Sequence, residues 1–365
     1  MNNEGRYLVN QQNCYELTNQ IKLMINGANT YIKICSFLMQ DKEIVDLLIK
    51  KSLSGIAIFV LSNLNEKKSD EYQSSSQVDT TKDIDDRDFG IDNHSVFLKN
   101  LYYNGIHVRS LIDLHAKFLI TDGMNALLMS ANIAPNSLKK NVETGITLNE
   151  MDAHELEYVF DVMYEYADIL KNVEAKNKDI ITKSHKVIPE ETFNILKSKL
   201  RITACSNGKQ KSETNLVALH KTSIYDEIIS IINHAQKYVY LVSWQFKALE
   251  NLPELKKSLS QALKRNVKIF FYCNRTGNDF GVEKQKQFLL KVRQMGCKVY
   301  SDTCNHSKCV INEKEGILFT ANIDGYAGMT TGFEVGCVFD VQQLTAATTH
   351  VKNLIKNGIE YGNKE

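Results

Sequence analysis

Apolar and polar positions follow a helical period and a strand period in turn, and the same order of segments occurs twice. The helix-like stretches at 16–28 and 226–235 each precede an apolar strand, YIKICSF (31–37) and YVYLVSW (238–244), at an offset of 207 between the strands. A second strand follows in each half, IAIFVLSN (56–63) and VKIFFYCN (267–274), at an offset of 211. Strands that alternate with helices predict an α/β layered domain.

The third pair of matching segments fixes how the duplication is organised. FLKNLYYNGIHVRS (97–110) matches FLLKVRQMGCKVYS (288–301) at an offset of 191, so the first half carries about 20 extra residues between the second and third pairs. We interpret 64–93, which is polar and acidic, as an inserted exposed loop. The chain is therefore predicted to form two tandem α/β/α sandwich lobes, 1–185 and 186–365, related by a pseudo-twofold axis with a shared site between them.

Composition limits the class of protein but does not name it. Of 365 residues, 43% are hydrophobic and 24% are charged, which is typical of a soluble globular chain. There is no apolar run of eighteen residues, and the first residues lack a signal-peptide pattern, so we expect a cytoplasmic protein with reduced cysteines. The net charge of +1 hides an acidic segment at 64–93 and a basic connecting segment at 171–211, which could attract a polyanion or be simply solvated.

Candidate chemistry lies in a motif that occurs once in each half. The first copy joins His115, Lys117 and Asp122, and the second joins His306, Lys308 and Glu313. Further polar residues follow each copy at matched positions: Ser130, Asn132 and Glu143 in the first, and Thr320, Asn322 and Glu334 in the second.

Strand geometry predicts that these residues gather. With a period of two, His115 and Lys117 face one side of a strand, and Asp122-Gly123 is a turn signal that sends the next strand back antiparallel. A plausible register then places Ser130 opposite Lys117 and Asn132 opposite His115.

This set of groups suits a phosphodiester. One imidazole can attack phosphorus to form a covalent intermediate, and a second can protonate the leaving oxygen. The lysines and asparagines, with the neighbouring hydroxyls, can hold the non-bridging oxygens, and a carboxylate behind each histidine can fix its tautomer. This chemistry requires no metal and no cofactor.

The doubled HxKxxxxD pattern, followed by a GSxN-like segment, resembles the phospholipase D, or HKD, superfamily over nearly the whole chain. The resemblance implies that His115 is the nucleophile and His306 the general acid. Several positions depart from the family pattern: Glu313 replaces an aspartate, Met129 and Phe319 replace glycines, and Thr320 replaces a serine. Asn312 is an alternative to Glu313.

The motif leaves the substrate open. A nuclease acting on DNA or RNA is our first expectation, because no membrane-spanning segment or secretion signal is found and the connecting segment is basic. A phospholipase D or transphosphatidylase acting on phospholipids is the alternative, and a nucleic-acid-binding scaffold subunit of a defence or repair complex is a third. The chain is expected to be a monomeric pseudo-dimer that could oligomerise further.

Two other features have competing interpretations. Cys304, His306 and Cys309 form a C-x-H-x-x-C pattern, but its spacing is not that of a structural zinc site and the first half lacks the cysteines. Phe37 and Trp244 end equivalent strands near the predicted site, where they could stack on a base, line an acyl pocket or pack in the core.

Overall fold

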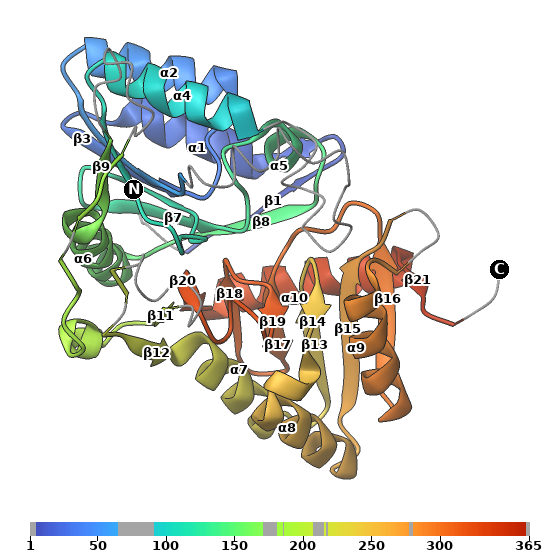
Figure 1. The fold of residues 1–365 in the computed structure, drawn as a ribbon. Coiled ribbons are helices and arrows are strands. Elements are labelled where there is room, and N and C mark those ends of the chain that lie inside the picture. The colour runs from blue at the N-terminus through green and yellow to red at the C-terminus, as the bar shows by residue number, and fades with distance from the viewer. Residues whose placement is uncertain are drawn as a thin grey trace, which may run out of the picture.

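The computed structural model describes residues 5–64, 91–170, 181–184, 186–206, 215–216, 218–276 and 280–362. Most of the expected inserted loop at 64–93, and part of the basic connecting segment, lie outside the described residues. The described chain forms two lobes, each built on one mixed β-sheet, and this confirms the predicted pair of α/β lobes (Figure 1).

The first lobe contains the elements that the repeat predicts, with short strands added at its start and end. Its strands are β1 (Tyr7–Gln11), β2 (Cys14–Tyr15), β3 (Tyr31–Ser36), β4 (Ala57–Ser62), β5 (His107–Ser110), β6 (Phe118–Thr121), β7 (Asn125–Met129), β8 (Glu143–Thr147), β9 (Asp168–Leu170) and β10 (Ile181–Thr182). Its helices are α1 (Glu16–Gly27), α2 (Lys42–Leu53), α4 (Ile91–Tyr103), α5 (Pro135–Lys139) and α6 (Glu150–Tyr166).

The second lobe repeats this order. Its strands are β11 (Leu200–Cys205), β12 (His220–Thr222), β13 (Tyr238–Val242), β14 (Phe246–Lys247), β15 (Lys268–Asn274), β16 (Lys298–Asp302), β17 (Cys309–Asn312), β18 (Gly316–Phe319), β19 (Ile323–Asp324), β20 (Gly332–Val338) and β21 (Ile359–Glu360). Its α-helices are α7 (Ser223–His234), α8 (Pro253–Lys264), α9 (Glu283–Gln294) and α10 (Val341–Asn357).

Both sheets have a parallel centre and antiparallel flanks. In the first, β3, β4 and β5 are parallel neighbours, and the order continues from β3 through β6, β7, β8 and β1 with antiparallel pairing. The second has the matching order from β16 through β15, β13, β17, β18 and β20 to β11. Helices that connect parallel strands must pack on a face of the sheet, and α2 and α4, like α8 and α9, do so.

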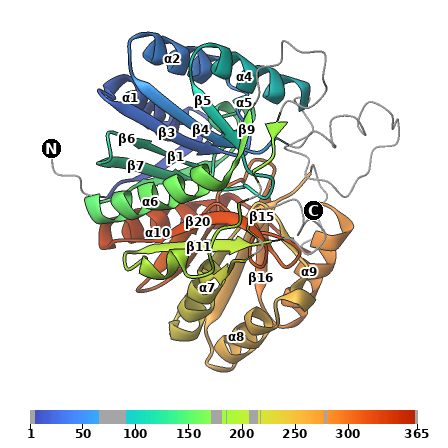
Figure 2. The same cartoon turned by 60° about the vertical axis from the view of Figure 1, so that its left-hand side comes forward.

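Three apolar cores hold five layers together. One core joins α1, α2 and α4 to the outer face of the first sheet, and another joins α7, α8 and α9 to the outer face of the second. The third lies between the lobes, where α6 and α10 pack with the inner faces of both sheets (Figure 2). Because this shared core is buried from both sides, the two lobes form one packed unit.

The motif hairpin forms as predicted, but its register differs by one residue. Asp122 and Gly123 both have positive φ, 53° and 71°, as a tight turn between β6 and β7 requires. Phe118 pairs with Leu128, and the Met129 amide donates to the Lys117 carbonyl at 3.1 Å. Lys117 therefore lies opposite Met129, and the expected pairing with Ser130 is wrong, because the turn at 122–124 is one residue shorter than that pairing requires.

The chain passes from the first sheet to the second between β10 and β11. A division at 185/186 would fall in this connection, and it remains a proposal. Within the described residues, no helix combines the length and apolarity needed to cross a membrane.

Candidate functional site between the lobes

The two histidines of the repeated motif lie where the lobes meet. His115 lies three residues before the start of β6 and His306 three residues before the start of β17, and each backbone N–H donates across the interface. The His115 amide donates to the Phe333 carbonyl at 3.0 Å, and the His306 amide donates to the Val142 carbonyl at 2.9 Å. These reciprocal bonds fix both histidines at one shared interface.

The carboxylates behind the histidines are exchanged between the lobes. Glu334 lies on β20 of the second lobe. Its Oε1 accepts a hydrogen bond from His115 Nδ1 at 2.7 Å. Glu143, on β8 of the first lobe, places Oε1 2.7 Å from His306 Nδ1. A carboxylate on Nδ1 fixes the tautomer and leaves Nε2 to act on a substrate. Sequence analysis anticipated a carboxylate behind each histidine but not that the opposite lobe supplies it.

The motif hydroxyls hold these glutamates. Ser130 donates to Glu143 Oε2 and accepts from the Thr144 amide at 2.9 Å. In the same way, Thr320 donates to Glu334 Oε2 and accepts from the Val335 amide at 3.1 Å. Both side chains are fully buried. Their expected role as phosphate ligands is therefore not supported by the geometry, because the hydroxyl of each is already engaged by a carboxylate and an amide.

The motif lysines are fully buried beside the histidines. Lys308 Nζ donates to the His306 carbonyl at 2.6 Å and lies 3.2 Å from His306 Nδ1. Lys117 Nζ likewise donates to the His115 carbonyl. Burying an ammonium is costly without compensating anions, and Lys117 lies close enough to Glu334, and Lys308 to Glu143, to lower the pKa of each carboxyl.

Two amides complete the set. Asn132 is 4% exposed and Asn322 is half-buried, and in the described part of the chain the buried Oδ1 atom of each has no hydrogen-bond partner. A buried polar atom without a partner is rare, and a ligand, water or substrate group commonly satisfies it. The two amides are therefore available to a bound molecule.

The charges of the site favour a neutral His115 and two ionised glutamates. Burial lowers the pKa of His115, and the ammonium groups of Lys117 and Lys308 lower it further, against the opposing effect of Glu334. Burial alone would raise the pKa of Glu334, but its contacts with His115, Lys117 and Thr320 outweigh burial and lower it. That Lys308 of one lobe affects His115 of the other indicates that both motifs share one site.

Glu143 follows the same balance. Burial would raise its pKa, but His306, Lys308 and Ser130 together lower it. Both glutamates are therefore anions that can stabilise a positive charge on the adjacent imidazole.

Asp122 and Glu313 lie at the far ends of the motif hairpins. The Asp122 carboxylate accepts from the amides of Asn29, Thr30 and Tyr31 at 2.8–3.1 Å, and Glu313 accepts from the amides of Gln236 and Lys237 at 2.8 and 3.3 Å. At about 3.3 Å per residue, seven residues of extended chain separate Asp122 from His115 by roughly 20 Å. The structure does not bring these carboxylates to the histidines, and they instead anchor the hairpin to the start of the neighbouring strand.

Glu313, and not Asn312, occupies the position equivalent to Asp122. Asn312 accepts from the amides of Lys314 and Glu315 at 2.7 and 2.9 Å inside its own turn. These bonds close the shorter second hairpin and leave Glu313 to bind the amides before β13.

An aromatic ring packs against each histidine. The ring centroids of Phe37 and His115 are 5.3 Å apart, and those of Trp244 and His306 are 5.4 Å apart. The side chain of His115 is 28% exposed, whereas that of His306 is 5% exposed. The site is therefore more open on the side of the first motif.

Sequence analysis missed two further amides that support the histidines. Asn63 Nδ2 donates to the carbonyls of Ile112 and Leu114, and Asn274 Nδ2 donates to the Asn305 carbonyl at 3.1 Å. Each asparagine thus holds the segment just before a histidine. The signal was present, because both asparagines end the matching strands IAIFVLSN and VKIFFYCN.

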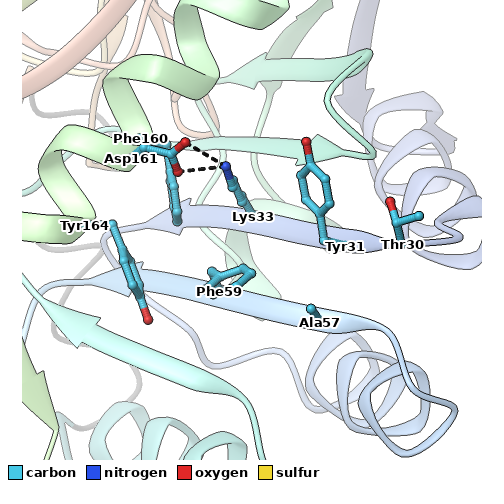
Figure 3. A pocket seen from close by; sticks show the side chains of 8 residues that line it. All are labelled: Thr30, Tyr31, Lys33, Ala57, Phe59, Phe160, Asp161 and Tyr164. Carbon is cyan, nitrogen blue, oxygen red and sulfur yellow. Dashed lines mark hydrogen bonds and ion pairs between the residues drawn. The ribbon is translucent and has the colours of Figure 1, made fainter.

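Other features take no part in this set. Among the described residues no group of three histidine, cysteine or acidic side chains is placed to hold a metal ion, and Cys304 is exposed whereas Cys309 is buried. A hollow on the inner face of the first sheet contains Lys33, whose ammonium pairs with Asp161 at 2.7 Å (Figure 3). The same ammonium also pairs with Glu157 at 2.7 Å. It is lined by Thr30, Tyr31, Lys33, Ala57, Phe59, Phe160, Asp161 and Tyr164. None of the motif residues lines it.

Comparisons with known proteins agree with this architecture. Residues 21–164 match a family model described as "Cardiolipin synthase, PLD-like domain", so this part of the chain is similar to phospholipase D-like domains. No curated protein matches the chain by sequence.

Two solved structures extend the likeness to the whole fold. Phosphatidylserine synthase from Haemophilus influenzae has a TM-score of 0.62 at 12% identity, and the match covers 97% of this chain and 87% of that chain. Polyphosphate kinase from Porphyromonas gingivalis has a TM-score of 0.56 at 12% identity, covering 96% of this chain and 46% of that chain. The chain thus spans less than half of the kinase, and at these identities the likeness concerns the fold.

Proposed function

We propose that this protein cleaves phosphodiester bonds through a covalent phosphohistidine, without a metal ion, at the site between its lobes. The observation that carries this proposal is the exchanged pair of contacts, His115 with Glu334 and His306 with Glu143. Two imidazoles, each oriented by a buried carboxylate and placed beside a buried lysine, provide a nucleophile and an acid for one reaction.

In the proposed reaction, the Nε2 lone pair of His115 attacks phosphorus. The bond from phosphorus to the leaving oxygen breaks, and that oxygen takes a proton from the His306 imidazolium. Water then attacks the phosphohistidine, its proton passes to His306, and the P–N bond breaks to return neutral His115. Lys117 and Lys308, with the amides of Asn132 and Asn322, would stabilise the charge on the non-bridging oxygens.

The assignment of His115 as nucleophile has two supports. Its pKa is lowered by burial, so the imidazole is neutral near pH 7 and its lone pair is available. Its side chain is also the more exposed of the two, so a substrate can reach it.

For the substrate, we propose nucleic acid first. The half-buried ring of Phe37, beside His115, suits stacking on a base next to the scissile phosphate, whereas Trp244 is buried against His306. A second candidate, cleavage or transfer of phospholipid head groups, is favoured by the fold likeness to phosphatidylserine synthase over 97% of the chain.

The test is cleavage of labelled single-stranded DNA, duplex DNA, RNA and phospholipid vesicles in excess EDTA. Wild type is compared with His115→Ala, His306→Ala and, as a matched control, His154→Ala, an exposed histidine on α6. We expect EDTA-resistant cleavage that both motif variants abolish and the control retains, with the label trapped on a peptide containing His115.

Each other result has a definite meaning. Cleavage that disappears in EDTA would refute the mechanism, and cleavage of vesicles alone would replace nucleic acid with lipid as the substrate. Salt-sensitive DNA binding without turnover of any substrate would favour the scaffold alternative.

A further inference from the structure

A buried histidine outside the motifs bridges two strand ends of the first lobe. His94 lies on α4 and is 4% exposed. Its Nδ1 accepts from the Met39 amide at 3.0 Å, and its Nε2 donates to the Asn63 carbonyl at 2.8 Å. The imidazole therefore ties the segment after β3 to the residue that follows β4.

Both tied segments lead directly to His115. Two residues before Met39, the ring of Phe37 packs against His115. Asn63, whose carbonyl His94 holds, uses its own side chain to hold the Leu114 carbonyl at 3.5 Å, one residue before His115. His94 thus supports His115 from two directions without touching it.

The second lobe carries the same device with a different residue. Gln285, on α9 at an offset of 191 from His94, accepts from the Phe246 amide at 3.0 Å through Oε1. Its Nε2 donates to the Asn274 carbonyl at 3.0 Å, and Asn274 in turn holds the residue before His306. His94 in the first lobe and Gln285 in the second therefore each supply one acceptor and one donor, and each ties together the ends of two neighbouring strands.

His94 and Gln285 differ in whether they can be protonated as the pH falls. A neutral imidazole can accept at Nδ1 and donate at Nε2, but a protonated imidazole only donates, so its Nδ1–H would face the Met39 N–H. The amide of Gln285 keeps its acceptor at any pH at which the protein is folded.

We propose that His94 is a proton-sensitive positioning residue for His115: protonation releases the segments that carry Phe37 and Asn63, and the second lobe is left unchanged. The part of this inference that concerns activity rests on the proposed function. The part that concerns the two bonds of His94 does not.

Among the described residues, no charged side chain acts on His94 to compensate its protonation. Burial lowers the pKa of His94, and the other influences on it are the backbone groups of Asn63 and Met39. Because the pKa in the folded state lies below its usual value, the bonds are intact at neutral pH and are lost as the pH falls through that lowered value.

Helix α2 and strand β5 pack against α4. Their ionisable side chains are either exposed to solvent or bonded to groups other than His94. On α2, the charged side chains are exposed or half-buried: Lys42, Glu43, Asp46, Lys50 and Lys51. The carboxylate of Asp41, before α2, accepts from the Ile44 amide and pairs with Lys139 at 3.3 Å. On β5, His107 is exposed and Arg109 donates to the carbonyls of Tyr164 and Glu165.

The decisive measurement is amide hydrogen exchange in the full chain at a series of pH values from 7 down to the lowest pH at which the protein stays folded, corrected for the intrinsic exchange rate. In wild type, we expect the protection of the Met39 amide to fall about tenfold once His94 is protonated, since one hydrogen bond is lost. The Phe246 amide, held by Gln285, is the internal control and should keep its protection.

Two variants exchange the imidazole and the amide between the lobes. His94→Gln should make the protection of Met39 independent of pH, and Gln285→His should transfer the acid sensitivity to Phe246. Loss of protection at Met39 that persists in His94→Gln, or constant protection in wild type, would overturn the proposal. If Gln285→His does not fold, His94→Gln alone still decides.

Activity then tests the link to His115. The acid limb of log kcat/KM against pH should be steeper in wild type than in His94→Gln, because two groups protonate in wild type and one in the variant. An equal slope would overturn the link to His115 while the exchange result stands. A wild type without phosphodiesterase activity would remove the proposed function, and exchange would still judge the bonds of His94.

Discussion

Replacing Glu334 with glutamine removes the negative charge behind His115 and nearly preserves the shape of the side chain. Glu334 is 2% exposed, its Oε1 lies 2.7 Å from His115 Nδ1, and its Oε2 accepts from Thr320. A charge-assisted hydrogen bond contributes about 1.5–3 kcal/mol. If that contribution is realised when His115 becomes positively charged on attack, the loss corresponds to about 10- to 150-fold in kcat/KM.

The same substitution at Glu143 should weaken a different step. Glu143 lies behind His306, which is proposed to protonate the leaving oxygen, so its effect should depend on how much that oxygen needs a proton. With an aryl phosphodiester, whose leaving group departs as a stable anion, Glu143→Gln should retain most activity. With an alkyl phosphodiester it should lose activity about as strongly as Glu334→Gln.

The assay compares both variants on both substrates, with Glu157→Gln as the matched control. Glu157 is a half-buried glutamate that pairs with Lys33 at 2.7 Å. It lies beside the hollow on the inner face of the first sheet, away from the two histidines. We expect Glu334→Gln to be slow on both substrates and Glu143→Gln to be slow only on the alkyl ester. The reverse pattern would show that His306 is the nucleophile, and full activity of Glu334→Gln would refute the reasoning from the exchanged contacts.

Three other predictions follow from the same structure. Ser130→Ala should lower kcat/KM by about tenfold, because Glu143 loses a buried donor, and circular dichroism should show the fold intact. Asp122→Asn should lower the free energy of unfolding by about 1 kcal/mol in urea titrations and leave kcat within about threefold; a large loss of kcat would restore Asp122 to the catalytic set. His350 is half-buried and its Nδ1 lies 2.9 Å from the Tyr7 hydroxyl, and desolvation lowers its pKa to about 4. Because its pKa is depressed in the folded state, its stabilising effect is present above pH 6.5 and is lost as the pH falls toward 4. Wild type should therefore lose about 2 kcal/mol between pH 7 and pH 5 that His350→Gln does not lose.

Much of the fold could be predicted because its signals are local. The strand period, the Asp122-Gly123 turn and the doubled spacing of the motifs each depend on a few neighbouring residues, and the sheets and hairpins follow from them. The strands β1 and β11, which with β2 and β12 extend one side of each sheet, lie before the segments that the repeat aligned and were not predicted.

The site was predicted less completely because its contacts depend on how the lobes pack. Glu334 meets His115 across 219 residues of sequence, and no local pattern distinguishes that pairing from one within a lobe. Ser130 was expected to bind phosphate because it follows the motif, but burial places its hydroxyl on Glu143 instead. Asp122 was grouped with the histidines by motif membership, whereas the length of β6 carries it to the other end of the strand.

The exchanged glutamates have a consequence for synthesis on the ribosome. When the first lobe emerges, His115 is present but its carboxylate partner, 219 residues further along the chain, has not been made. Under the proposed function, the growing chain therefore carries its nucleophile without the group that orients it until Glu334 is added. Hydrolytic activity would begin only after the second lobe has been made and has docked on the first, so products truncated before Glu334 would be inactive.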